Sequence, residues 1–243
     1  MLSLKKSNQP LQQLNVQKNK LFSVISHDLK NAMAGPSGLL ELIIEDFEDL
    51  SKDKVFEYLK VMNSSTENAM KLLFDLLSWA KNQFQEAEPF FADVELQRNS
   101  EEIIKQQQQI ASDEGVSIVN NLHGACVIEA DESMINTVLR NLLSNAIKFS
   151  HPGGDVIIEG NKLGQEVQLS VQDSGVGMDR KTLDKIFDKT TNFTTKGTHG
   201  EKGSGLGLDL CIDFIKKYNG KIWAESEPDE GSRFHILLSL KQK

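Results

Sequence analysis

The sequence is poor in cysteine and proline, and it has no excess of positive charge. It holds two cysteines and five prolines in 243 residues, and its formal net charge is −8. Cys126 and Cys211 lie far apart, in apolar surroundings and without metal-ligand spacing, so we expect buried free thiols in a reducing compartment. The acidic balance argues against a nucleic-acid-binding protein, which would normally show a basic face.

Long apolar runs are also missing. No run approaches the ~18 residues of a membrane-spanning helix, and the N-terminus does not continue into the apolar core of a signal peptide. We therefore expect a soluble chain, either complete or the intracellular part of a longer protein. Its apolar content of 39% and charged content of 26% are ordinary for a globular protein, and its length allows one large or two small domains.

The first ninety residues carry a helical pattern. Glycine and proline are sparse there, and apolar residues recur every three or four positions from Phe22 to Leu50 and again from Val55 to Ala80. This pattern predicts two long helices joined by a short turn. Because the apolar stripe of the second helix is too wide for a bare hairpin, we expect two hairpins to form a four-helix bundle in a homodimer.

A cluster of glycine and proline at residues 35–38 interrupts the first helical series. A proline inside a helix removes a hydrogen bond and clashes with the preceding turn, so we expect a bend about two turns past His27. The bend is either a hinge or a purely structural kink.

A histidine with polar neighbours lies on the outer face of the first predicted helix. At about 100° per residue His27 lies opposite the apolar stripe, with Asp28 beside it and Asn31 one turn later. A carboxylate can hold one ring nitrogen protonated and stabilise the cation that forms as the other attacks. The amide can hydrogen-bond an attacking water or a phosphoryl oxygen. An ordinary solvated polar face is the alternative.

The chain after residue 89 mixes helices with strands. We expect helices over 100–110 and from an Asp131 cap to about Phe149, and strands near 116–121, 126–129, 155–161, 166–172, 221–225 and 232–240. Interleaved helices and mostly antiparallel strands predict an α/β sandwich.

Three polar residues lie at the edge of the apolar stripe of the helix that Asp131 caps. Asn141, Asn145 and Lys148 fall within an arc of about 60°. They form either an ordinary solvated face or, at the rim of a pocket, a site for Mg²⁺ and a triphosphate. Asparagine supplies a neutral oxygen to a hard cation, and lysine supplies a point charge to phosphates.

Two glycine clusters bracket the segment from Asp173 to Leu208. Asp173 stands at the head of the first cluster, and the second opens an amphipathic helix that ends near Gly220. Glycine allows a backbone to approach a ligand closely, and a helix N-terminus offers N–H groups to phosphate. The segment between the clusters has no continuous apolar periodicity, so we interpret it as a mobile nucleotide lid.

Together these motifs resemble the cytoplasmic kinase core of two-component sensor histidine kinases, over nearly the whole chain. Residues 22–31 look like the phosphoacceptor box, and residues 141–149 are similar to the N box. Residues 173–177 and 203–207 are similar to the two glycine boxes, and Ile186-Phe187 is similar to the F box. The motifs stand in the order and at the spacing of that family.

The resemblance implies a helical hairpin for dimerisation and histidine phosphotransfer over residues 1–88, and a Bergerat ATP-binding sandwich over residues 89–243. It implies a protein-histidine kinase that uses ATP and Mg²⁺, works as a homodimer and passes its phosphoryl group to a response regulator. His27 would attack the γ-phosphoryl group with Asp28 as acid–base partner, and Asn31 would position water for dephosphorylation of the regulator. The location would be cytoplasmic, alone or as the cytoplasmic portion of a membrane-bound sensor.

The same resemblance assigns the nucleotide site. Asp173 would hydrogen-bond the adenine amino group, and Phe149 would lie beside the ring. Asn145, with Asn141, would hold Mg²⁺, and Lys148 would meet the phosphates. The other predicted nucleotide-binding positions are Gly175, Gly177, Phe187, Gly203, Gly205, Leu206 and Gly207.

The sequence departs from the family pattern at Ala32, where the family usually has a proline, and at the lid, which lacks the commonest proline–aromatic pattern. A non-catalytic nucleotide-binding scaffold and a phosphatase-only regulator are the alternatives to an active kinase, and a gyrase-like ATPase would need a further domain. The remaining histidines show no acidic partner of matching geometry and are read as structural: His123, His151, His199 and His235.

Overall fold

The computed structural model describes residues 34–84, 91–122, 126–188, 195, 197–198 and 205–240. The chain divides into two compact units, Met1–Gln85 and Glu86–Lys243. No helix in the described ranges is both long enough and apolar enough to cross a membrane.

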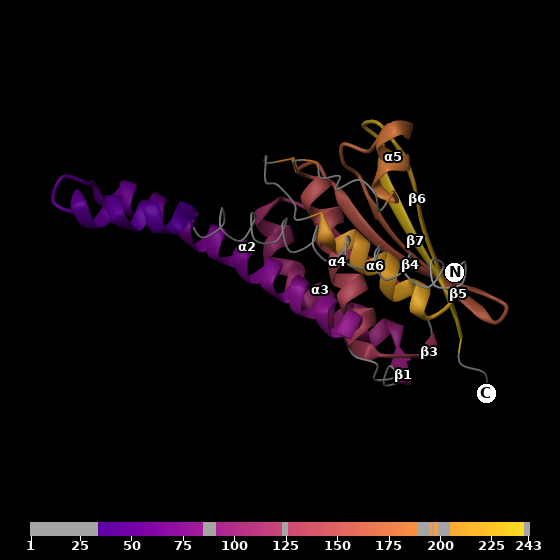
Figure 1. Ribbon diagram of the computed structural model, residues 1–243. Helices are drawn as coiled ribbons and strands as arrows, with labels where there is room; N and C mark the ends of the chain where they lie inside the picture. Colours follow the sequence, from indigo (N-terminus) through magenta and orange to yellow (C-terminus); the bar gives the residue numbers. More distant parts are fainter. Residues whose placement is uncertain are drawn as a thin grey trace, which may run out of the picture. The chain divides into compact units, whose positions relative to one another are not determined.

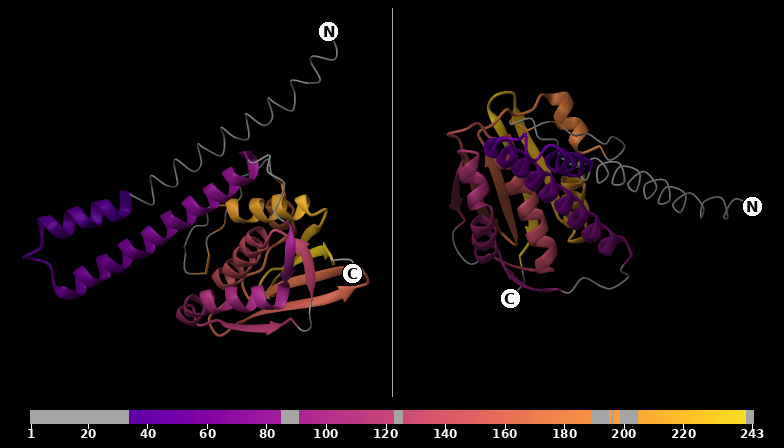
Figure 2. Two further views of the ribbon diagram at one scale, coloured as in Figure 1. Left: turned by 90° about the horizontal axis from the view of Figure 1, so that it is seen from below. Right: turned by 90° about the vertical axis from the view of Figure 1, so that its left-hand side faces the viewer.

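The first unit contains a helical hairpin. Residues 34–45 are helical, residues 46–51 form the turn, and α2 (Lys52–Phe84) follows (Figure 2). The prediction that the first helix reaches Leu50 was wrong. The acidic residues at 45–49 would place negative charge at the negative end of the helix dipole, and Ser51 caps the next helix by accepting from the Lys54 N–H at 3.3 Å.

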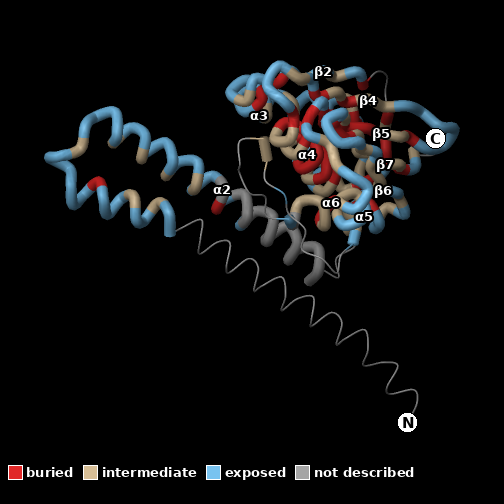
Figure 3. Tube along the Cα trace, turned by 90° about the horizontal axis from the view of Figure 1, so that it is seen from above, coloured by how far each residue is buried: buried red, intermediate tan, exposed pale blue. Residues whose placement is uncertain are grey.

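The hairpin leaves much apolar surface uncovered. Of its described side chains, Ile43 and Ala69 are buried, while large apolar residues remain 38–68% exposed: Leu40, Leu42, Ile44, Phe47, Phe56, Leu59, Val61, Met70 and Leu73. Figure 3 shows the hairpin as mostly exposed. Pro36 lies within the helical residues 34–45. Residues 1–33, which a bend at this position would set at an angle to residues 34–45, lie outside the described residues.

The second unit is an α/β sandwich, as predicted. Its elements are β1 (Ala92–Glu95), α3 (Leu96–Asp113), β2 (Ser117–Asn121), β3 (Val127–Ala130), α4 (Glu132–Phe149), β4 (Asp155–Leu163), β5 (Glu166–Asp173), α5 (Arg180–Ile186), α6 (Leu206–Lys217), β6 (Lys221–Glu227) and β7 (Gly231–Ser239). Five strands form a sheet in the order β2–β4–β5–β7–β6, with β2 and β4 parallel and the other neighbours antiparallel. Strands β1 and β3 form a separate antiparallel pair, and α4 and α6 lie against one face of the sheet (Figure 1).

The core lies between that face and the helices. Alternate residues of the strands point into it: Val156, Ile158, Val167, Leu169, Val171, Ile236 and Leu238, each at most 3% exposed. The predicted stripe of α4 packs against them, and the Asp131 carboxylate caps α4 by accepting from the N–H groups of Ser133 and Met134. Asp173 comes last in the inward-facing series of β5, so the strand places a carboxylate at the edge of an apolar core.

The sequence did not reveal two of the described elements, β1 and α5. Strand β1 has four residues and buries only Val94 deeply. Helix α5 buries no side chain, so it has no apolar stripe to detect, although Asp179 caps it by accepting from the Thr182 N–H at 2.8 Å. Helix α3 also begins four residues before the predicted start, because Leu96, Asn99 and Ser100 are buried.

Candidate functional site

The side chain of Asp173 is the buried acid of the site. It is 4% exposed, and its Oδ1 accepts hydrogen bonds from the backbone N–H groups of Gly175 and Ser232, each at 3.1 Å. Burial raises the pKa of Asp173 to about 6, against the two backbone hydrogen bonds and the charge of His151, which lower it. Both bonds end on Oδ1, so Oδ2 is the oxygen available to a further donor.

The first glycine cluster fits tightly between neighbouring backbones. A Cβ on Gly175 would overlap the carbonyl oxygen of Phe149, which also accepts from the Val176 N–H at 3.1 Å. Gly177 has a φ of +58°, and a Cβ there would overlap the carbonyl oxygen of Glu227. Only glycine satisfies both close approaches, so this cluster joins the end of α4 to the turn that follows β6.

Of the predicted polar residues of α4, Asn141 faces the start of α6. Asn141 is 7% exposed and donates from Nδ2 to the Thr137 carbonyl at 3.0 Å. Its Oδ1 would lie 2.6 Å from a Cβ on Gly207, so α4 and α6 approach closely at this point. Asn145 and Lys148 are half-buried on the next turn of the helix.

Lys148 and Phe149 end α4 beside the glycine cluster. The Lys148 ammonium lies 5.2 Å from the centroid of the Phe149 ring. The Lys148 carbonyl accepts from the Thr198 N–H at 3.2 Å and from its hydroxyl at 2.9 Å, so a described part of the predicted lid contacts this helix end.

Helix α6 begins with the second glycine cluster. Gly205 is its N-cap residue, with a φ of +73° that glycine adopts without strain. The first N–H groups of the helix have no partner within the helix, and with the helix dipole they favour an anion at this end.

The structure therefore brings together several of the predicted positions. Gly175 lies against Phe149 at the end of α4 and donates its N–H to Asp173, and Gly207 lies against Asn141 in the middle of that helix. Gly177 lies against Glu227 at the end of β6. Gly205 and the backbone of Leu206 begin the neighbouring helix. Phe187 directly follows α5 and is half-buried. Helix α5 packs against β6. The predicted residues His27, Asp28, Asn31 and Gly203 lie outside the described residues.

Sequence reasoning missed the contribution of the turn between β6 and β7 and of the first residues of β7. The Ser232 N–H reaches Asp173, and the Asp229 N–H donates to the Val176 carbonyl at 2.9 Å. The only signal was the turn sequence at residues 228–231, which predicts a turn but not what it touches.

The prediction that His235 has no acidic partner was wrong. Its Nε2 lies 3.7 Å from Oε2 of Glu225, and its ring stacks on Trp223 with centroids 4.9 Å apart. Burial lowers the pKa of His235, against the charge of Glu225, which raises it. Because side chains alternate along β7, His235 lies on the opposite sheet face from Ile236 and does not belong to the Asp173 site.

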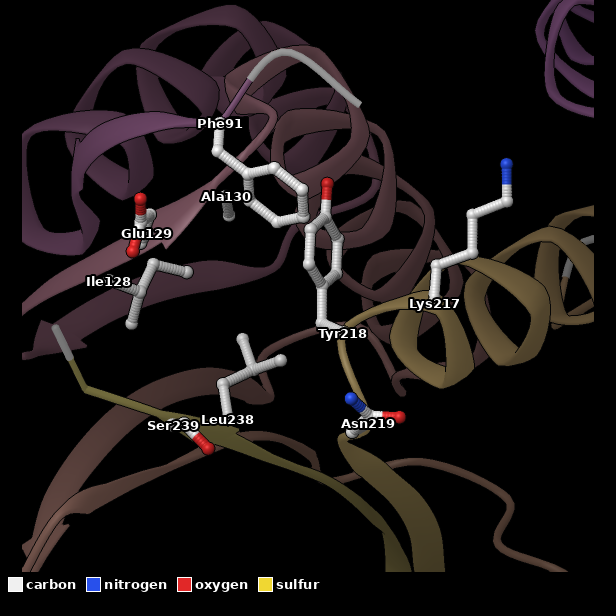
Figure 4. A pocket seen from close by; sticks show the side chains of 9 residues that line it. All are labelled: Phe91, Ile128, Glu129, Ala130, Lys217, Tyr218, Asn219, Leu238 and Ser239. Atoms are coloured by element: carbon white, nitrogen blue, oxygen red, sulfur yellow. The ribbon is translucent and has the colours of Figure 1, made fainter. Parts of the chain in front are cut away.

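A pocket of about 140 Å³ lies elsewhere, at the C-terminal end of α6 (Figure 4). Phe91 and Tyr218 meet edge to face on one side of it, with ring centroids 5.8 Å apart. Gly205 begins the same helix, so this pocket is separate from the glycine clusters.

Comparison with known proteins identifies two families. Residues 17–85 match the His Kinase A (phospho-acceptor) domain. Residues 130–242 match the histidine kinase-, DNA gyrase B- and HSP90-like ATPase. The two matches fall on the hairpin and on the sandwich.

Two curated relatives are similar to this chain over nearly its full length. The adaptive-response sensory kinase SasA of Crocosphaera subtropica is 28% identical over 98% of this chain and 63% of its own length. The sensor histidine kinase WalK of Bacillus subtilis is 26% identical over 96% of this chain and 38% of its own length. The chain thus spans less than two thirds of either relative.

A solved structure has the same fold. Histidine kinase ThkA, in complex with the response regulator protein TrrA, superposes with a TM-score of 0.72 at 19% identity. The superposition covers 99% of this chain and 67% of that one.

Proposed function

We propose that this chain, which belongs to the two-component sensor histidine kinases, transfers the γ-phosphoryl group of ATP to His27. A ring nitrogen of His27 forms a bond to the γ-phosphorus while the bond to the β–γ bridging oxygen breaks, and ADP leaves. Asp28 holds the proton on the other ring nitrogen and stabilises the cation. The transfer depends mainly on positioning and charge neutralisation.

The observation that carries this proposal is the buried carboxylate of Asp173, with Oδ1 fixed by two backbone N–H groups. Its Oδ2 accepts from the amino group of adenine, and Phe149 lies beside the base. An acceptor held in this way selects a base that carries a donor, because a base without one leaves the buried carboxylate unpaired.

The phosphates lie between the ends of α4 and α6 in this proposal. The backbone of the second glycine cluster, residues 203–207, binds the polyphosphate together with the N-terminus of α6, and Lys148 adds a positive charge. Asn145, with Asn141, holds Mg²⁺ through side-chain oxygens. When bound there, Mg²⁺ would supply positive charge that offsets the charge of the phosphates. No group of three or more His, Cys, Asp or Glu side chains in the described ranges has metal-site geometry, which fits an ion held mainly by the nucleotide.

We further propose that residues 1–88 dimerise and carry the phosphoacceptor, and that residues 89–243 bind ATP. The exposed apolar residues of the hairpin support a four-helix bundle made by two chains. The phosphoryl group then passes to an aspartate of a response regulator, as the complex of the relative ThkA with TrrA suggests. Asn31 positions the water that hydrolyses the phosphoryl group from the regulator. The reaction takes place in the cytoplasm.

Autophosphorylation with γ-labelled ATP and Mg²⁺ tests the proposal. The wild type takes up label that is labile in acid and stable in base, His27→Gln takes up none, and His123→Gln, which changes a histidine without a proposed role, keeps it. A wild type that binds ATP without taking up label contradicts the kinase activity. A non-catalytic scaffold or a phosphatase would then be the better explanation.

A further inference from the structure

The turn between β6 and β7 and the start of β7 each contact the first glycine cluster at one point. The Asp229 N–H donates to the Val176 carbonyl at 2.9 Å, and the Ser232 N–H donates to Oδ1 of Asp173 at 3.1 Å. Asp173 and Ser232 lie 59 residues apart in the chain. The orientation of the carboxylate therefore depends on how the start of β7 is held.

The hydroxyl of Ser226 holds the first peptide of β7, in addition to the pairing of β6 with β7. Ser226 lies opposite Ser232 in the β6–β7 ladder, and its Oγ donates to the Gly231 carbonyl at 2.8 Å. Its Oγ also lies 3.0 Å from Oγ of Ser232. A hydroxyl has one proton, and that of Ser226 is used by the carbonyl, so Ser232 is the donor in the second bond.

The Gly231 carbonyl and the Ser232 N–H belong to the same peptide group. A trans peptide is planar, with its C=O and N–H pointing in opposite directions. When Ser226 binds the carbonyl oxygen, it therefore fixes the direction in which the N–H points, which is toward Asp173. The Ser226 hydroxyl on β6 thus helps to orient the hydrogen bond from the Ser232 N–H to Asp173, although it takes no part in that bond.

This peptide needs such a restraint because it follows a glycine. Gly231 has a φ of +89°, and a Cβ there would overlap the carbonyl oxygen of Asp173, so no other residue fits. Glycine is also the residue whose backbone rotates most freely. The close contact with Asp173 requires glycine, and the hydroxyl of Ser226 limits the rotation that glycine allows.

We propose that Ser226 is a positioning residue for the nucleotide base. By fixing the Gly231–Ser232 peptide it orients the Asp173 carboxylate, so that Oδ2 meets the amino group of adenine. The inference rests on the proposed role of Asp173 in binding ATP.

The test compares the affinities for ATP and for inosine triphosphate, which has a carbonyl in place of the adenine amino group. Ser226→Ala weakens ATP binding about tenfold, which corresponds to about 1.4 kcal/mol, and changes inosine triphosphate binding little. Ser226→Thr retains the hydroxyl and keeps the discrimination of the wild type. Ser170→Ala, which changes a buried serine of the same sheet, is the matched control.

A purely structural role would not shift the pH profile. Loss of the Ser232 hydrogen bond raises the pKa of Asp173 further. As the pH is lowered, Asp173 is therefore protonated earlier in Ser226→Ala, and the ATP affinity of this variant begins to fall at a higher pH than that of the wild type. His151, the other charged group that acts on Asp173, is present in all variants. If Ser226→Ala also lowers the thermal unfolding midpoint, Ser226→Cys, with its weak S–H donor, replaces it.

Unchanged discrimination and an unchanged pH profile in Ser226→Ala would overturn the inference while leaving the proposed function intact. Equal weakening of both nucleotides would also overturn it, because it would indicate general loosening of the site. A wild type that binds no ATP would instead contradict the proposed function itself.

Discussion

The hairpin and the sandwich bury their apolar residues to very different extents. Most large apolar side chains described for residues 34–73 remain exposed, whereas the sandwich encloses a continuous core between α4, α6 and the inner face of its sheet (Figure 3). A hairpin that cannot cover its own stripe depends on a second surface for stability. The sandwich has its own core, and its costly feature is instead a buried carboxylate at the edge of that core.

The two tryptophans allow this comparison to be tested unit by unit. Trp79 lies in α2 and Trp223 in β6. A Trp223→Phe background reports unfolding of the hairpin, and a Trp79→Phe background reports unfolding of the sandwich.

The largest effect is expected from Leu59→Lys in the hairpin. Leu59 is 49% exposed within one chain, but a bundle of two chains would bury it, so a lysine there should cost about 3 kcal/mol of unfolding free energy. Ile110→Lys changes a residue of α3 that is 51% exposed and should cost within about 0.5 kcal/mol. Urea unfolding and light scattering at several protein concentrations measure both changes.

The wild-type hairpin should also become less stable on dilution, whereas the sandwich should not. Equal small costs for the two substitutions, with no effect of concentration, would mean that the hairpin is stable without a partner. The contrast between the two units would then be one of exposure alone.

An intermediate effect of opposite sign is expected from Asp173→Asn in the sandwich. The pKa of Asp173 is raised from 3.8 to about 6 on folding, so its contribution to stability is fully present below pH 3.8 and is lost as pH rises through about 6. At neutral pH the ionised carboxylate thus destabilises the sandwich. The amide oxygen of asparagine can keep both backbone hydrogen bonds, so the variant should be about 2 kcal/mol more stable at pH 8.

Urea unfolding at pH 8 and pH 5, in the background that retains Trp223, tests this sign. The advantage of Asp173→Asn should shrink at the lower pH, and ATP binding should be lost at both. Asp113→Asn, at an exposed position of α3, is the control and should show no such pH dependence. A variant that is less stable than the wild type at pH 8 would show that the carboxylate stabilises the fold.

Local patterns predicted the local structure. The Asp131 cap and the apolar stripe of α4 are adjacent in sequence, so the helix begins and ends where expected. The short strand β1 and the helix α5 lacked a stripe that sequence reasoning could detect. The end of the first helix was predicted wrongly for the opposite reason. The apolar spacing continues past the helix, and in the prediction it outweighed the acidic residues at 45–49.

Contacts between distant segments were not predictable in this way. The glycines beside Asp173 indicated close approaches but not their partners, which are the Phe149 and Glu227 carbonyls. The bond from Ser232 to Asp173 exists because β7 pairs with β5, and the approach of His235 to Glu225 exists because β7 pairs with β6. One sequence without the register of its strands does not contain this information.

The smallest effect is expected from Ser51→Ala, at the start of α2. The Ser51 hydroxyl accepts from the Lys54 N–H at 3.3 Å, and losing such a cap should cost the hairpin about 1 kcal/mol. Ser64→Ala, at an exposed position inside the same helix, should instead stabilise it slightly, because alanine has the higher helix propensity. Both changes should appear in the Trp79 signal and leave the Trp223 signal unchanged. A shift of both signals by Ser51→Ala would mean that the two units unfold together, and the hairpin would then take part of its stability from the sandwich.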